Sequence, residues 1–301
     1  MHNASKNLLF SICLTAMAFA ATSAEAKEYN LFLVAGQSNA VGYATNASQL
    51  PASSADANIP FFFDCGDPGY DAGVHDSSSM GAWTTLKAQP IGHPTTGNRQ
   101  YGNFQYNQGG FGPEISIGRD LYNDGVSNVA VMKFAYSGTS FRDNDWNKGN
   151  PLYEDMKSRY AQAVSQLAVN GNTVKLAGLF WIQGESDYGS TTYQADFSKF
   201  IANIRADYNA PKLLVFCGFN AAYDPTCATV VQAQQAVAAS DPLVWYVGLQ
   251  NAARVDSIHF SSTGELQVGS LFASTYIANV PEPATLSLLA FGALAVLKRR
   301  K

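Results

Sequence analysis

Histidine and cysteine are scarce in this chain: its 301 residues include four of each. No spacing between them resembles a zinc or haem site, so the sequence predicts neither a metal centre nor a bound cofactor. The chain also lacks the run of ~20 apolar residues that a comfortable membrane-spanning helix needs. Its two apolar runs, Leu8–Ala21 and Leu286–Leu297, are shorter, and they lie near the chain ends.

The N-terminal run has the features of a secretory signal peptide. Lys6 precedes it, and Ala24-Glu25-Ala26 offers a small-x-small cleavage pattern. We therefore expect residues 1–26 to direct export and to be removed after Ala26. A buried N-terminal helix is the alternative, which the short run and the cleavage pattern disfavour.

The C-terminal residues 281–301 have three parts. Pro281-Glu282-Pro283 prevents a helix from continuing out of the domain, an apolar run follows, and Lys298-Arg299-Arg300-Lys301 should stay cytoplasmic. This arrangement closely resembles the PEP-CTERM sorting signal of Gram-negative bacteria. The resemblance implies an exosortase as processing partner, transient anchoring in the inner membrane, and delivery to the envelope or extracellular matrix. A tail that is never cut is the alternative.

Residues 27–280 form the expected mature domain, and about 250 residues are enough for one large α/β domain. The whole chain has 19 basic and 23 acidic residues, of which five basic and two acidic ones lie in the terminal segments. The remaining 14 basic and 21 acidic residues give a net charge of −7. Such a domain binds nucleic acid and anionic membranes poorly, so we expect a neutral substrate and membrane contact only through the C-terminal segment.

Three cysteines belong to this domain, namely Cys65, Cys217 and Cys227. In an oxidising compartment this odd number allows one disulfide and one free thiol, with three pairings open. The pair Cys217–Cys227 closes the shortest loop and is the pairing that the spacing favours.

The alternation of apolar and amphipathic segments predicts the fold class. Five short runs, LFLVAG and VAVMKFA among them, are nearly continuously apolar, which is typical of parallel strands covered by helices on both faces. The expected strands are Tyr29–Ala35, Asn128–Ala135, Leu176–Ile182, Lys212–Cys217 and Leu243–Gly248. The expected helices are Glu114–Tyr122, Leu152–Leu167, Thr192–Tyr208, Ala228–Ala239 and Thr263–Ala278. This order predicts an α/β fold, a three-layer α/β/α sandwich with a five-stranded parallel sheet.

The stretch from Val41 to Gly112 does not follow that alternation. It is rich in glycine, proline, serine and asparagine, and a loop of this length is usually functional or disordered. Its many aromatic residues argue against disorder. We interpret it as a folded insertion that either supplies sugar-stacking rings near the site or packs on the sheet edge. The aromatic residues are Phe61, Phe62, Phe63, Tyr70, Trp83, Tyr101, Phe104 and Tyr106.

A serine, a histidine and an aspartate follow expected strands in positions suited to nucleophilic catalysis. Ser38 lies in Gly36-Gln37-Ser38-Asn39, just past the first strand, where α/β sheets bind their ligands. His259 follows the last strand, whereas His75 and His93 lie in the insertion. Asp256, three residues before His259, can orient its imidazole. Taken alone the Ser38 signal is weak, because most serines that follow a glycine turn are helix caps.

Two further strand ends offer donors for an oxyanion hole. Gly138 in YSGTS presents an unhindered backbone amide, and Gln183 in WIQGESD presents a side-chain amide. Together with the Ser38 amide they predict a three-donor oxyanion hole. A turn glycine and a polar strand end are the structural alternatives.

Taken in order, GQSNA, YSGTS, WIQGESD and DSIHF resemble the conserved blocks of the SGNH hydrolases. The QGESD version is similar to the branch with sialate O-acetylesterases and acetylxylan esterases, and Phe111-Gly112-Pro113-Glu114 resembles its G-P-E segment. The resemblance implies a flavodoxin-like fold, no metal, and ester hydrolysis through an acyl-serine. It also implies supporting roles for Gln37 and Asn39.

The chain departs from the general SGNH pattern at two points. Gln183 stands where those enzymes have an asparagine, and Glu185 is a second acidic candidate beside Asp256. We favour Asp256 as the acid that orients His259 and assign Glu185 a supporting role. Arg142 and Asp143 either contact sugar hydroxyls or form a surface salt link, which is the simpler expectation.

The sequence therefore predicts an exported serine esterase that removes acetyl groups from carbohydrate, with Ser38, His259 and Asp256 as its catalytic residues. A lipolytic esterase of broader acyl range and a non-catalytic polysaccharide-binding matrix protein are the alternatives. A binding protein has no need of the complete catalytic set. The sequence leaves the glycan open among acetylated xylan, acetylated sialic acid and the cell's own acetylated exopolysaccharide.

Overall fold

The computed structural model of the chain describes residues 25–66, 77–91 and 104–280. Most of the expected signal peptide, the C-terminal sorting segment, His75 and His93 lie outside these residues. Within the described ranges no helix is both long enough and apolar enough to span a membrane.

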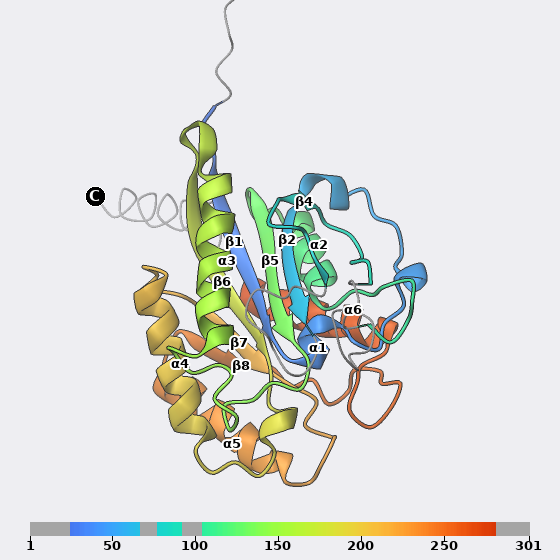
Figure 1. Cartoon of the computed structure of the whole chain (residues 1–301), viewed down its shortest axis with the longest axis vertical. Coiled ribbons are helices and arrows are strands. Elements are labelled where there is room, and N and C mark those ends of the chain that lie inside the picture. Colours follow the sequence, from blue (N-terminus) through green and yellow to red (C-terminus); the bar gives the residue numbers. More distant parts are fainter. Residues whose placement is uncertain (1–24, 67–76, 92–103, 281–301) are drawn as a thin grey trace, which may run out of the picture.

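A single sheet runs through the centre of the molecule (Figure 1). Its parallel strands lie in the order β2-β5-β1-β6-β7-β8, and the short β3 and β4 pair antiparallel with β2. The bounds are β1 (Glu28–Gly36), β2 (Pro60–Gly66), β3 (Ser77–Ser78), β4 (Thr84–Thr85), β5 (Val129–Tyr136), β6 (Thr173–Ile182), β7 (Val215–Gly218) and β8 (Val244–Tyr246). All five expected strands are confirmed, but among the described residues the sheet has eight strands rather than five.

The unexpected parallel strand β2 lies inside the stretch that we interpreted as an insertion. Its residues Phe61, Phe62 and Phe63 are buried and pair with β5, so these rings belong to the core and do not line a sugar site. This segment is therefore a strand of the sheet itself, which neither interpretation of the stretch described. The sequence did not predict this strand because the run is short, begins at a proline, and has an aromatic content like that of the surrounding loop.

Helices cover both faces of the sheet. Side chains of α3, α4 and α5 pack in one apolar cluster and those of α1, α2 and α6 in the other; in Figure 1, α3 crosses in front of the sheet and α6 lies behind it. The bounds are α1 (Ser38–Val41), α2 (Glu114–Asp124), α3 (Pro151–Leu167), α4 (Tyr193–Asp207), α5 (Cys227–Ser240) and α6 (Ser262–Asn279). The five expected helices and the three-layer sandwich are thus confirmed.

Local sequence explains several helix ends. Pro151 begins α3, where its fixed φ suits the first turn and its missing N–H costs nothing. Gly125 ends α2 with a φ of 97°, which a residue with a side chain rarely adopts. Ser261 accepts a hydrogen bond from the Gly264 amide and caps α6, the helix that follows His259.

The expected disulfide is absent. Cys217 and Cys227, the expected partners, are both free thiols and both buried. Cys217 and Cys227 belong to the same apolar cluster, where each packs as a small hydrophobic side chain. Burial raises the pKa of the Cys227 thiol to about 11 and that of Cys217 further, which makes both poor nucleophiles.

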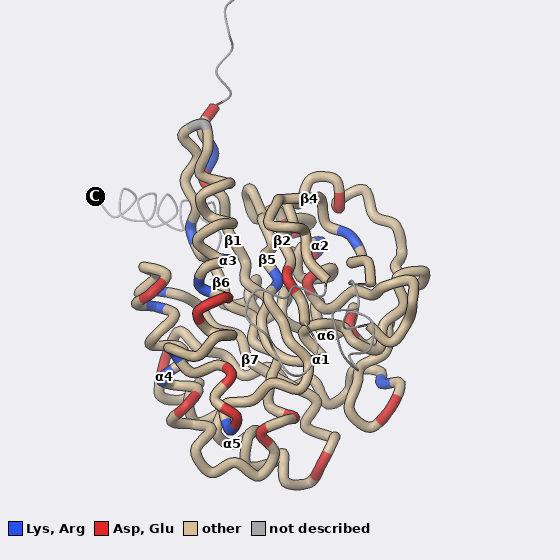
Figure 2. Tube along the Cα trace, viewed as in Figure 1, with Lys and Arg blue, Asp and Glu red and all other residues tan. Residues whose placement is uncertain are grey.

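Charged residues are scattered over the described chain. In Figure 2, the Lys and Arg positions and the Asp and Glu positions are scattered along the trace, and no long basic stretch is visible. Three of the arginines form ion pairs with carboxylates, namely Arg119 with Asp56, Arg159 with Asp64, and Arg205 with Asp241. Each of these three pairs connects neighbouring elements of the fold.

Candidate active site

Ser38 follows a sharp turn at the end of β1 and begins α1. Gly36 has a φ of 143°, and a Cβ there would lie 2.0 Å from the carbonyl oxygen of Ile182, so the turn requires glycine. The backbone N–H of Gln37 donates to that same carbonyl at 3.0 Å. This turn places Ser38 at the carboxyl edge of the sheet, with 6% of its surface exposed.

The strand register brings the other two predicted donors to the same edge. Gly36 pairs with Ala135 on β5 and with Ile182 on β6. Gly138 and Gln183 therefore follow the neighbours of the strand that carries Ser38. Within the described part of the chain, the backbone N–H groups of Ser38 and Gly138 have no hydrogen-bond acceptor. Two unpaired amides at this edge are what an oxyanion hole requires.

His259 and Asp256 lie in contact. The imidazole Nδ1 is 2.9 Å from Asp256 Oδ2, while Asp256 Oδ1 accepts the backbone N–H groups of Ile258 and His259 at 2.7 and 2.6 Å. Burial alone would raise the pKa of Asp256, but these three hydrogen bonds outweigh it and lower that pKa. The carboxylate therefore stays ionised at neutral pH and can accept the Nδ1 proton.

Asn39 connects the turn that carries Ser38 with the loop that carries His259, called the histidine loop below. Its side chain donates to the carbonyl of Ile258 at 3.0 Å and accepts the N–H of Phe260 at 3.1 Å. These two backbone groups flank His259, so the residue next to Ser38 holds the histidine loop from both sides. No Ser38–His259 hydrogen bond occurs in the described residues, and such bonds often form only once substrate is present.

Glu185 lies behind this connection. Its Oε1 accepts the Asn39 side-chain amide at 2.7 Å and the backbone N–H of Asn220 at 2.9 Å. Burial raises the pKa of Glu185, although these hydrogen bonds oppose the rise. Glu185 makes no hydrogen bond to the imidazole; it orients the side chain that holds the histidine loop.

Asn220 is a site residue that the sequence analysis missed. Its side-chain amide donates to the carbonyls of Ser257 and Ile258 at 3.0 and 2.7 Å. It follows β7 just as Ser38 follows β1, so a polar residue after a buried strand was the available signal.

The side chains of Gln37 and Gln183 form a hydrogen bond beside the turn that carries Ser38. Gln37 Oε1 accepts from Gln183 Nε2 and from the backbone N–H groups of Gly184 and Ser186, at 3.2 to 3.3 Å. Gln183 is fully buried, and its Nε2 also faces Asp187 Oδ2 at 2.7 Å and the Thr139 carbonyl at 3.3 Å. An oxyanion would have to displace one of these acceptors.

Asp187, also missed from the sequence, connects the second and third blocks. It accepts the backbone N–H groups of Phe141 and Arg142 as well as the Gln183 amide. Burial raises the pKa of Asp187, and the three hydrogen bonds oppose that rise. The loop that carries Gly138 is thereby tied to the loop that carries Gln183.

The expected salt link of Arg142 is not found in the described residues. Arg142 donates to the carbonyl of Tyr188 and lies 5.4 Å from the centre of that exposed ring, while Asp143 accepts the Ser140 hydroxyl. Arg142 and Tyr188 follow β5 and β6, so both belong to the edge that carries Ser38. A guanidinium beside an exposed aromatic ring is a suitable surface for sugar hydroxyls.

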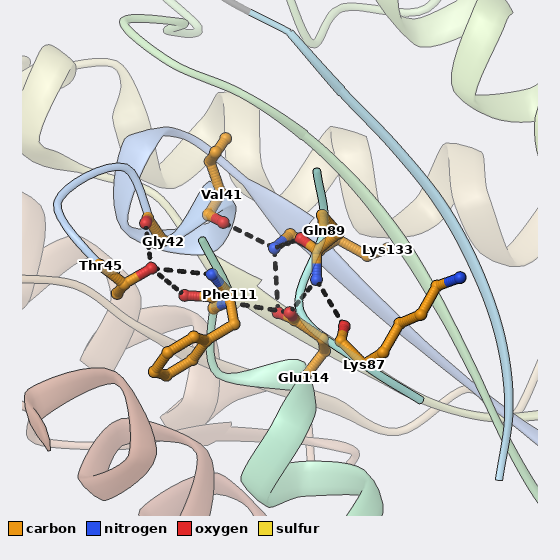
Figure 3. A network of polar contacts seen from close by, with 9 residues as sticks. Val41, Gly42, Thr45, Lys87, Gln89, Phe111, Glu114 and Lys133 are labelled. Carbon is orange, nitrogen blue, oxygen red and sulfur yellow. Dashed lines mark hydrogen bonds and ion pairs between the residues drawn. The ribbon is translucent and has the colours of Figure 1, made fainter. Parts of the chain in front are cut away.

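A buried ion pair lies beneath the end of α1 (Figure 3). Lys133 and Glu114 are fully buried and 3.1 Å apart, and Lys133 Nζ also donates to Gln89 Oε1 and to the carbonyl of Val41, both at 2.6 Å. Glu114, the acid of the G-P-E segment, accepts from Gln89 Nε2 and from the Gly112 amide at 2.8 Å. This pair joins β5 and α2 to the end of α1, three residues after Ser38.

Replacing Lys133 with methionine is expected to destabilise the protein by about 3–5 kcal/mol, because it leaves the Glu114 carboxylate buried without its counter-charge. Urea unfolding measures the change. The matched control is Lys148→Met, which removes a 43%-exposed partner of Asp207 and should cost about 1 kcal/mol or less. Adding Glu114→Gln to Lys133→Met should restore part of the loss. Equal stability of Lys133→Met and the wild type would contradict this account.

Two family models match the chain. The carbohydrate esterase, sialic acid-specific acetylesterase family matches residues 28–278, and the PEP-CTERM protein-sorting motif matches residues 279–301. No curated protein matches the chain in sequence. The PEP-CTERM motif indicates export by a Gram-negative bacterium and association with its envelope.

Three solved structures share the fold. A protein from Arabidopsis thaliana has a TM-score of 0.63 at 19% identity, with 85% of this chain and 99% of that protein covered. NanS has a TM-score of 0.57 at 20% identity, covering 85% and 98%. A carbohydrate acetylesterase from Xanthomonas citri has a TM-score of 0.51 at 16% identity, covering 81% and 54%. Since the first family model spans almost the whole described domain, the chain belongs to the carbohydrate esterase, sialic acid-specific acetylesterase family and is a carbohydrate O-acetylesterase.

Proposed function

We propose that this protein hydrolyses O-acetyl esters on an exported glycan through an acyl-serine intermediate formed on Ser38. His259 takes the Ser38 proton as Oγ attacks the acetyl carbonyl, and Asp256 stabilises the imidazolium that forms. The bond between the acetyl carbon and the sugar oxygen then breaks, and the imidazolium gives its proton to that oxygen, which leaves as the sugar hydroxyl. Water enters, loses a proton to His259 and attacks the acyl-serine, which releases acetate and restores the serine.

The observation that carries the proposal is the contact between His259 Nδ1 and Asp256 Oδ2. Asn39, the residue directly after Ser38, holds the loop that contains this pair through two hydrogen bonds. The backbone amides of Ser38 and Gly138 supply two donors for the oxyanion. Gln183 supplies the third if its amide turns from Thr139 or Gln37 toward the substrate. The Asp187 hydrogen bond can stay intact in that movement, because the amide has two hydrogens.

The terminal segments support an extracellular substrate. We propose that residues 1–26 are removed on export and that an exosortase processes the segment from 281 to 301, which anchors the chain in the inner membrane until then. The mature enzyme then works on acetylated polysaccharide in the envelope or the matrix. The acidic domain favours a neutral glycan such as acetylated xylan or a neutral exopolysaccharide over an anionic one.

Acetate release tests the proposed function. The purified protein is incubated with acetylated xylan, with O-acetylated sialic acid and with p-nitrophenyl esters of increasing acyl length. We expect acetate from at least one glycan and a preference for the acetyl ester over butyrate. A preference for butyrate or longer esters would indicate the lipolytic alternative. No hydrolysis of any ester by the folded protein would leave only a binding role.

A further inference from the structure

One aromatic ring at the site has no part in the proposed chemistry. The half-buried Tyr43 packs on the imidazole of His259, with ring centres 4.7 Å apart and planes inclined by 43°. We infer that Tyr43 is a positioning residue, which holds the catalytic imidazole in the orientation that lets its Nε2 face Ser38. This inference rests on the proposed function, because the orientation matters only if His259 is the base.

The imidazole benefits from such a contact because its hydrogen bond to Asp256 is partly exposed to water. The Asp256 side chain is 49% exposed, so water competes for the carboxylate that holds Nδ1. A single hydrogen bond at Nδ1 also leaves the ring free to tilt about that bond. An aromatic ring in contact with the imidazole limits this tilt, and the inclined ring of Tyr43 makes that contact here.

Tyr43 is itself held in place by its backbone. Its N–H donates to the carbonyl of Ser38 at 3.0 Å, and its carbonyl accepts the N–H of Gln105 at 2.8 Å. The preceding Gly42 has a φ of 80°, and a Cβ there would lie 1.9 Å from the carbonyl oxygen of Phe111. Movement of this turn away from Phe111 would break the two hydrogen bonds of Tyr43. Movement toward Phe111 is blocked by the close approach of Gly42 to the Phe111 carbonyl.

The buried ion pair fixes the same turn from below (Figure 3). Lys133 donates to the carbonyl of Val41, two residues before Tyr43. The hydroxyl of Thr45, two residues after it, lies 2.8 Å from the carbonyl oxygens of both Gly42 and Phe111, which share its one hydrogen, and it accepts the Phe111 N–H at 2.8 Å. One short segment thus carries both the nucleophile and the ring that contacts the base, which keeps their separation constant.

Three substitutions test this role. Tyr43→Ala is expected to lower kcat for acetate release about 10- to 100-fold with little change in KM, since a misplaced base impairs chemistry more than binding. Tyr43→Phe keeps the ring and should stay within about threefold of the wild type. Tyr122→Ala is the matched control: this tyrosine is 38% exposed in the last turn of α2, which leads into the start of β5, the opposite end of that strand from Gly138, and the change should leave kcat unchanged.

A spectroscopic measurement separates this role from the esterase activity itself. In a Ser38→Ala background, 15N spectra of the His259 ring should show one tautomer, with the proton on Nδ1 against Asp256. Adding Tyr43→Ala should broaden or average these ring signals, while the unfolding midpoint stays close to that of the parent. The His259 signals are assigned by their loss in His259→Asn.

The outcomes are distinguishable. If the wild type hydrolyses no ester, the proposed function fails, whereas the ring spectra still report whether Tyr43 orders the imidazole. Wild-type kcat and unchanged ring signals in Tyr43→Ala would overturn the inference. Equal loss in Tyr43→Ala and Tyr43→Phe would assign the effect to the hydroxyl and overturn it too. If Tyr43→Ala does not fold, Tyr43→Leu keeps most of the side-chain volume without the flat ring and should show the same loss of kcat.

Discussion

Replacement of Ser38 by alanine is expected to lower kcat for acetate release by about 10⁴- to 10⁶-fold, because no other group can form the acyl intermediate at this edge of the sheet. The hydroxyl makes no hydrogen bond within the described residues, so removing it leaves no buried polar group unpaired. We therefore expect the free energy of unfolding to change by no more than about 0.5 kcal/mol. Acetate release and urea unfolding on one preparation measure both quantities.

The matched control for this substitution is Ser190→Ala. Ser190 lies in the loop after β6, where its hydroxyl contacts only Thr192 in the described structure, so kcat should remain at the wild-type value. Residual activity of Ser38→Ala above about 1% of the wild type would assign the nucleophile to another group. Fluorophosphonate labelling gives an independent result, since the reagent should modify Ser38 in the wild type and in Ser190→Ala but not in Ser38→Ala.

The strands and helices were predictable because their apolar patterns match their burial. Apolar runs such as LFLVAG are buried on both faces, as β1 shows, and the periodic segments form the helices that cover them. β2 was not predictable by the same rule, because PFFFDCG is short and stands in a loop with a similar composition. Its place beside β5 depends on long-range pairing that no local pattern records.

The position of Ser38 could be predicted because a residue at the end of a parallel strand has its place fixed by the strand. His259 lies in the loop between β8 and α6, so the sequence indicated its side of the sheet but not the contacts that hold it. Contacts between separate loops could not be predicted. Asn220 binds the carbonyls of the histidine loop from a position 37 residues before Ser257, and Tyr43 meets His259 across more than two hundred residues of chain. These contacts depend on how β1, β7 and β8 are ordered in the sheet, which one sequence does not specify.

The prediction of a Cys217–Cys227 disulfide was wrong because it, too, relied on sequence spacing alone. Loop length favours Cys217–Cys227, but the two side chains lie on β7 and at the start of α5 and point into the apolar cluster between sheet and helix. Cys217 Sγ instead lies 3.5 Å from the carbonyl oxygen of Trp245. Sequence spacing reports the cost of closing a loop, whereas a disulfide also needs two side chains directed at one another.

Asp256→Asn is expected to lower kcat about 10²- to 10⁴-fold by forcing the wrong histidine tautomer. Asp256 Oδ1 accepts the backbone N–H groups of Ile258 and His259, so an asparagine there will keep its oxygen on these donors. Its NH₂ group must then face His259 Nδ1, which becomes an acceptor. The remaining ring proton lies on Nε2, and such an imidazole cannot take the Ser38 proton.

Glu185→Gln is the matched substitution at the competing acid, and we expect it to lower kcat by less than about 10-fold. A glutamine can present Oε1 to Asn39 and to the Asn220 amide as the glutamate does, while Oε2 of Glu185 has no hydrogen-bond partner to lose. The substitution also removes a carboxyl group whose pKa burial raises. Comparison of the two kcat values decides which acid orients His259. A larger loss of kcat in Glu185→Gln than in Asp256→Asn would assign that role to Glu185. Its carboxylate would then have to reach His259 when substrate is bound.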